Sequence, residues 1–129
     1  MKHDTGLLIL RIGLGILFLF SGFGKLTGIL GPGISGFAAM VYGSLILAWL
    51  VALGEFFGAI SLLTGIWTKW STIWLSVIML GAIFIVNIPA LSDLNNPMGF
   101  GGLLMNLSVL TSLLALMLTG PGQYSFGKA

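Results

Sequence analysis

The chain has 129 residues, of which 57% are hydrophobic and 6% charged, and its formal net charge is +2. Because a soluble domain carries about 25% charged residues, this composition predicts an integral membrane protein. The absence of cysteine excludes disulfides, thiolate-held iron–sulfur clusters and cysteine-ligated zinc, and the small charge without a basic stripe argues against nucleic acid as a partner.

Four apolar segments are each long enough to cross a bilayer, which takes roughly 20 residues. None alternates with period two, and an open sheet cannot span lipid, so each segment is predicted to be a helix. The sequence predicts an all-α membrane protein, a four-transmembrane-helix bundle that forms a single membrane domain over residues 1–129. The predicted helices cover about 6–28, 44–67, 70–89 and 101–119.

The first helix follows a short basic stretch, as the apolar core of a signal peptide does. Its apolar run nevertheless continues past Arg11 and shows no small-x-small cleavage site, so we expect the helix to be retained. The longest connection follows, over residues 29–43. There Ser35 is expected to cap a short interfacial helix between the first and second spans, from Gly36 to Tyr42.

Three of the predicted spans end on the same tripeptide, Leu-Thr-Gly, closing at Gly28, Gly65 and Gly120. Glycine just past the last turn tolerates the left-handed backbone that ends a helix, so we expect three helix caps rather than an internal repeat. The second and third helices are joined tightly around Thr68-Lys69, and a polar loop from Asp93 to Gly102 follows the third.

An even number of crossings places both termini and the Lys69 turn on one side of the membrane. That side carries Lys2, Lys69 and Lys128, whereas the other side carries Asp93 and, near a helix end, Lys25. The positive-inside rule therefore predicts that both termini are cytoplasmic.

Glu55 lies alone in an otherwise uncharged run from Ser44 to Trp67. A carboxylate within a membrane span is costly unless it faces a partner or a wet cavity, and this one is too deep and too short to reach the headgroups. Three explanations are open. Glu55 pairs with Lys25 or Arg11, it is protonated and hydrogen-bonded to amides, or it lines a ligand cavity.

Counting about 1.5 Å per residue from the inner end of each predicted helix, polar groups from four helices fall in one layer of the outer half. The depths are roughly 18 Å for Glu55, 20 Å for Asn106, 22 Å for Ser21, 24 Å for Asn87 and 28 Å for Lys25, with Arg11 apart at roughly 8 Å. We therefore predict a polar pocket centred on Glu55 and open toward the outer leaflet. Its candidate residues are Glu55, Lys25, Arg11, Asn87, Asn106 and Ser21.

The other five residues also have plainer explanations. Ser21 and Asn106 are typical of the hydrogen bonds that join membrane helices. Asn87 stands two residues before a proline and can satisfy the carbonyl groups that the proline frees. Lys25 can extend to the outer headgroups and Arg11 to the inner ones, because long basic side chains snorkel.

Lys25 and Glu55 each lie inside a pair of glycines four residues apart, Gly24/Gly28 and Gly54/Gly58. Such pairs permit two helices to approach closely. Both charged side chains are therefore expected at contacts between helices rather than facing acyl chains.

Several segments follow one another in an order that, taken together, is fairly specific to one protein family. They are Arg11, the Ser-Gly-x-Gly-Lys run at 21–25, the segment around Glu55 at 48–58, and the closing Gly120-Pro121-Gly122. In these segments, and over essentially its whole length, the chain resembles the DoxX family of small integral membrane proteins.

The resemblance implies a four-helix protein of a prokaryotic inner membrane. The family takes its name from a subunit associated with a terminal quinol oxidase, and its DoxD relatives are tied to thiosulfate oxidation with quinone as acceptor. Other members are described as membrane components that work beside oxidoreductases or oxidative-stress enzymes. Many relatives carry histidine where this chain has Asn87, so no proton relay is expected through that position.

The first functional hypothesis is a small membrane subunit of, or accessory to, a respiratory or redox oxidoreductase complex that is linked to quinone. No cofactor is expected to be bound covalently or through metal ligands, because cysteine is absent and the one histidine, His3, stands at the start of the chain. Quinone is the candidate ligand. The expected partners are the lipid bilayer with other membrane or peripheral redox subunits, or further copies of the chain, and not nucleic acid.

Two alternatives belong to other classes. Buried ionisable residues also mark transport pathways, so the chain could be part of a small oligomeric transporter or channel. A purely structural subunit is the other alternative, in which the charged pair only fixes helix register. A stand-alone enzyme is the least supported, since the spans offer neither a nucleophile–base arrangement nor a pair of carboxylates.

Overall fold

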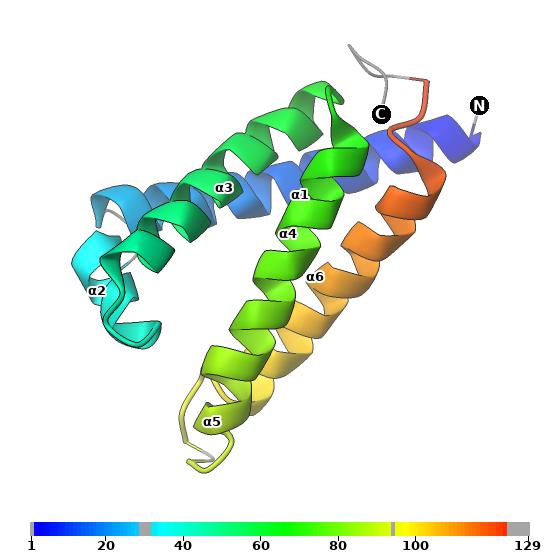
Figure 1. Ribbon diagram of the computed structural model, residues 1–129. Helices are drawn as coiled ribbons and strands as arrows, with labels where there is room; N and C mark the ends of the chain where they lie inside the picture. The colour runs from blue at the N-terminus through cyan, green and yellow to red at the C-terminus, as the bar shows by residue number, and fades with distance from the viewer. Residues whose placement is uncertain (1, 29–31, 94, 124–129) are drawn as a thin grey trace.

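The computed structural model describes residues 2–28, 32–93 and 95–123, and these ranges consist of helices and their connections (Figure 1). Four apolar spans and a short helix between the first two confirm the predicted all-α architecture. The elements are α1 (Lys2–Thr27), α2 (Gly33–Met40), α3 (Leu45–Thr64), α4 (Thr68–Ala82), the π-helix η1 (Ile83–Asn87), α5 (Ile88–Ala90) and α6 (Phe100–Thr119).

The boundaries differ from the prediction mainly at α1, which begins at Lys2 instead of residue 6. Hydropathy detects only the apolar part of a helix, whereas a polar first turn is stable when, as here, it carries an acidic residue, Asp4, near the positive end of the helix dipole. The three predicted glycine caps are confirmed. Gly28, Gly65 and Gly120 all adopt a left-handed φ between 79° and 81°.

The short helix α2 lies nearer the first span than predicted, at Gly33–Met40 instead of residues 36–42. The expectation that Ser35 caps it is wrong, because Ser35 lies inside its first turn and Pro32 takes the capping position without a side-chain hydrogen bond. Proline suits the start of a helix, since its φ is already fixed near the helical value and it has no N–H to leave unpaired.

The third span is continuous from Thr68 to Ala90 but changes its winding toward its end, at Ile83–Asn87. Pro89 cannot donate a hydrogen bond and its ring would crowd the carbonyl group one turn earlier. The chain responds with a wider turn, in which the Ile88 N–H donates to the Ile83 carbonyl five residues back. The π-turn ends at Asn87 and thereby sets the direction in which that side chain points.

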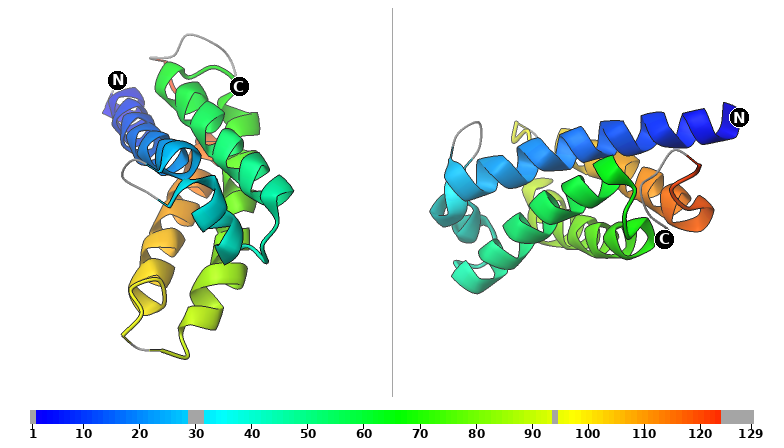
Figure 2. Two further views of the ribbon diagram at one scale, coloured as in Figure 1. Left: turned by 90° about the vertical axis from the view of Figure 1, so that its left-hand side faces the viewer. Right: turned by 90° about the horizontal axis from the view of Figure 1, so that it is seen from above.

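The spans pack as two pairs, α1 with α3 and α4 with α6 (Figure 1). The pairs cross, and they converge near the start of α1 and the end of α6, whereas they diverge toward α2 and α5, as the turned views of Figure 2 also show. Fully buried apolar side chains join the two pairs where they meet. They are Phe18, Leu62, Leu75, Leu113 and Leu116.

Candidate functional site

Lys25 and Glu55 form an ion pair between α1 and α3, with 2.5 Å between the lysine Nζ and Glu55 Oε1. Ser21 closes a small ring with them, because its hydroxyl donates to Glu55 Oε2 at 2.8 Å and accepts from Lys25 Nζ at 2.8 Å. The Glu55 side chain is 1% exposed and that of Lys25 17%. The first of the three explanations for Glu55 therefore holds with Lys25 as its partner, and the idea that Lys25 snorkels to the headgroups is wrong.

The local sequence explains why the three side chains meet. Ser21 and Lys25 are four residues apart on α1, so they share one face of the helix. Between them, Gly22 brings α1 very close to α3, since a Cβ at this position would lie 2.8 Å from the Phe56 backbone nitrogen. Glu55 directly precedes Phe56 on α3, so its buried carboxylate lies beside this contact.

A second polar group lies on the other helix pair. Asn87 Nδ2 donates to the Met98 carbonyl at 2.6 Å, and Asn106 Nδ2 donates to Asn87 Oδ1 at 2.6 Å. Asn87 is buried by close packing against Gly102, where a Cβ would lie 2.7 Å from Nδ2. Asn87 thus bonds to the loop after the third span, and the explanation that it serves carbonyls freed by the nearby proline is wrong.

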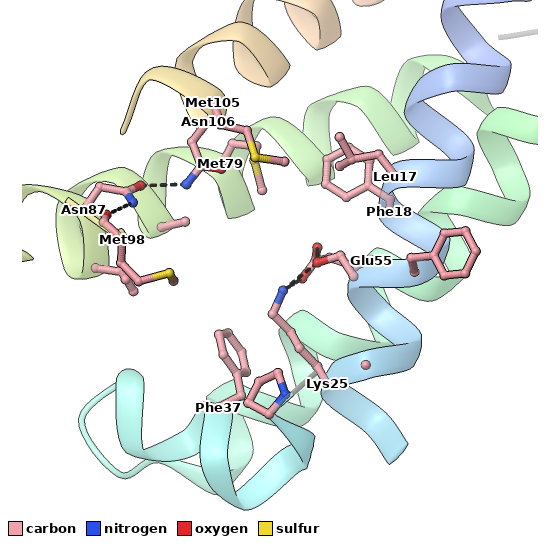
Figure 3. Close-up of a pocket in the computed structure, with 16 residues that line it drawn as sticks. Leu17, Phe18, Lys25, Phe37, Glu55, Met79, Asn87, Met98, Met105 and Asn106 are labelled. Atoms are coloured by element: carbon pink, nitrogen blue, oxygen red, sulfur yellow. Dashed lines mark hydrogen bonds and ion pairs between the residues drawn. The ribbon is translucent and has the colours of Figure 1, made fainter. Parts of the chain in front are cut away.

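The two polar groups line one cavity of about 330 Å³ where the helix pairs diverge. Figure 3 shows the Lys25–Glu55 pair on one side of this cavity and Asn87 with Asn106 on the other. Within the described residues no hydrogen bond joins the two groups directly. Five of the six predicted pocket residues therefore surround one space, with apolar side chains between the two polar groups.

The apolar wall contains residues that the sequence did not single out. Phe37 of α2 lies against the lysine, with the Nζ of Lys25 4.9 Å from the centre of its ring, which is a favourable position for a cation over an aromatic face. Three methionines, Met79, Met98 and Met105, also line the cavity. Methionines carry no distinctive pattern in an apolar sequence, whereas Phe37 could have been noticed on the short helix predicted between the first and second spans.

Arg11 does not take part in this site, contrary to the prediction. Its side chain is fully buried near the converging end of the bundle. There Nη1 donates to the Leu62 carbonyl and Nε to the Pro121 carbonyl, both at 2.9 Å. The alternative that Arg11 snorkels to the inner headgroups is also wrong, because this side chain ties the end of α3 and the segment after α6 to α1.

Four apolar spans, with a cavity that carries polar side chains at two of its sides, define a small polytopic integral membrane protein. The DoxX family model matches residues 6–88, which is more than half of the chain and includes Arg11, Ser21, Lys25, Glu55 and Asn87. The chain belongs to the DoxX family.

A curated relative supports this assignment along the whole chain. Over 133 residues the chain is 32% identical to "Inner membrane protein YqjF" of Escherichia coli strain K12, with 98% of this chain and 92% of the relative covered. No solved structure matches the chain.

Proposed function

We propose that the protein is a small subunit of, or accessory to, a quinone-linked oxidoreductase complex of the inner membrane, to which it contributes a ligand pocket and no redox cofactor of its own. The observation that carries the proposal is the cavity between the helix pairs, with hydrogen-bonding groups at two sides and apolar walls between them. Its volume of about 330 Å³ is that of a small ligand site.

The charges of the cavity favour a neutral ligand. Glu55 and Lys25 neutralise each other, so the pair offers no net charge that would attract an anion or a cation. A lysine has three N–H donors, of which Glu55 and Ser21 take two. The third N–H can donate to a neutral hydrogen-bond acceptor of the ligand, such as a quinone carbonyl.

The opposite wall suits the second polar end of such a molecule. A quinone carries carbonyl groups at both ends of a flat, mostly apolar ring. The amides of Asn87 and Asn106 can donate to an oxygen or accept from a hydroxyl. The phenylalanine and methionines between the two polar groups fit the ring itself, because aromatic and thioether groups pack well on flat π-systems.

The amino-acid composition of the chain supports a role as a subunit rather than as a complete redox enzyme. The sequence has no cysteine, and its one histidine, His3, stands in the first turn of α1 and does not line the cavity, so the cavity offers neither of the ligands that most often hold haem and iron–sulfur clusters. A partner would then supply the electrons for quinone chemistry, and this chain would hold and orient the quinone.

Gentle purification from the native membrane tests the proposal, with mass spectrometry of the proteins and of the extracted small molecules. We expect a redox enzyme or quinone in stoichiometric amount. Glu55→Gln should lose the quinone, whereas Thr111→Val, which alters a hydroxyl on α6 bonded only within its own helix, should retain it. A clean homo-oligomer with neither companion would contradict the proposal and favour a transport or structural role.

A further inference from the structure

A second cavity adjoins the first at the Lys25–Glu55 pair. It has a volume of about 260 Å³ and lies between α3 and the third span. Six residues line both this cavity and the larger one, namely Lys25, Phe37, Glu55, Met79, Ala82 and Val86. The ion pair therefore stands where two spaces meet. We call this second cavity the lateral cavity. The rest of its lining is apolar apart from the indole nitrogen of Trp74.

The lateral cavity opens on the surface that faces lipid. Leu50 on α3 is 52% exposed and Val77 on α4 is 58% exposed, and both line it. These residues lie within apolar spans, so the surface around them contacts acyl chains in a membrane. An apolar molecule dissolved in the bilayer can thus approach the ion pair without crossing an aqueous phase.

Trp74 limits the lateral cavity at the other end. Its indole lies directly on Gly54, where a Cβ would come within 2.0 Å of the ring nitrogen. Trp74 also lines a separate groove between α3 and α4 that reaches Trp67 and Trp70, so this indole divides the helix interface into two compartments. A hydrocarbon chain that enters between α3 and α4 beside Val77 would reach the Lys25–Glu55 pair.

We propose that the site binds an amphipathic lipid-soluble ligand, with its neutral head in the larger cavity at Lys25 and its long apolar tail in the lateral cavity between α3 and α4. This inference rests on the proposed function and adds the class of ligand and its route of entry. The balanced charge of the pair selects a neutral head, and the apolar lateral lining selects a hydrocarbon tail over a second polar group.

Gly81 provides a test that acts on the tail alone. It lines the lateral cavity, and a Cβ added there meets nothing within 4 Å, so Gly81→Leu can fold while its side chain fills the cavity. Gly13→Leu on α1 is the matched control, because its Cβ is equally free and it lines neither cavity. Val77→Trp at the lateral opening provides a second, independent obstruction.

The protein is placed in lipid nanodiscs and titrated with two probes, a dimethoxy-methyl-benzoquinone carrying a decyl chain and the same headgroup without the chain. Binding is followed by quenching of tryptophan fluorescence. We expect Gly81→Leu and Val77→Trp to weaken the decyl quinone about tenfold and to leave the chainless quinone unchanged. Gly13→Leu should bind both like the wild type, and Glu55→Gln should weaken both.

The outcomes separate the two proposals. If the wild type binds both quinones and Gly81→Leu and Val77→Trp leave the decyl quinone unaffected, the tail does not occupy the lateral cavity, while the proposed function stands. Equal weakening of both quinones by these two variants would overturn the inference in the same way. If the wild type binds neither quinone, the proposed function itself fails, and this inference with it.

Discussion

Glu55 is held by two donors, the Lys25 ammonium and the Ser21 hydroxyl, while its carboxylate is almost completely buried. A charge in this position would be very costly without its partner, since neither lipid nor the apolar cavity wall can solvate it. The pair is therefore a unit, and the contribution of either residue depends on the presence of the other.

This dependence is measurable as a double-mutant cycle. Removing one partner of a buried pair costs about 3–5 kcal/mol, whereas replacing both with apolar residues is often nearly neutral. We expect Lys25→Met and Glu55→Leu each to lower the free energy of unfolding by about 3–5 kcal/mol, and the double variant to recover most of the loss. SDS titration of the protein in mixed micelles measures the effect. Additive losses in the double variant would show that the two charges are stabilised separately.

The sequence was sufficient to identify Glu55 and to name Lys25 as one of two partners, because both are charged residues in apolar surroundings. It could not choose between Lys25 and Arg11, since a depth estimate contains no information on the direction of a side chain. The buried role of Arg11 depends on the backbone carbonyl groups of Leu62 and Pro121, which no pattern of side chains reveals.

At the scale of elements, α1 and α3 come closest together at two glycines of α1, Gly15 and Gly22. Beside Gly22 the two backbones are so close that a Cβ would lie 3.1 Å from the Ala52 carbonyl oxygen. Close backbone approach of this kind is how membrane helices associate when lipid tails are as apolar as the side chains. It also fixes how far Ser21 and Lys25 stand from Glu55.

We therefore expect Gly22→Ala to force α1 and α3 apart and to destabilise the protein by about 1–3 kcal/mol. The control is Gly13→Ala on the same helix. Its Cβ meets nothing within 4 Å, so it should be neutral or gain up to about 1 kcal/mol from better helix propensity. Unfolding in mixed micelles distinguishes the two variants, and equal effects would exclude a specific contact at Gly22.

The glycine pair around Glu55 predicted a close helix contact without naming the partner helix. Gly54 and Gly58 do lie at such a contact, against Trp74 and Leu75 of α4. Spacing along one helix indicates that a partner can come close and leaves open which helix it is. The partner follows from the folded arrangement, which the sequence pattern of a single chain does not contain.

At the scale of the whole molecule, the cavity lies where the two helix pairs diverge, and the apolar core lies where they converge. Hydropathy predicted the number and approximate length of the spans, because each must bury its backbone in lipid. It could not predict the crossing of the pairs, since helices that are apolar on all faces carry no stripe that indicates their neighbours.

The orientation in the membrane remains a prediction, and Lys128, one of the charges on which it rests, lies outside the described residues. The chain has no cysteine, so single cysteines can report on each side. With cytoplasmic termini, Ser92→Cys should react with a membrane-impermeant maleimide in intact cells, and Gln123→Cys only after permeabilisation. Both positions are exposed at opposite ends of the spans, and the unchanged chain should give no label. The reverse pattern would place the termini outside.

Arg11 joins both helix pairs at the end where they converge, because one of its bonds ends on α3 and the other just after α6. Lys25 lies roughly 21 Å farther along the same helix by the helical rise, so α1 acts as a lever arm between the two. A rotation of one pair against the other by about 5° around Arg11 would shift the facing wall at Lys25 by about 1.8 Å. A change at Arg11, which does not line the cavity, would thus alter the width of the cavity from a distance.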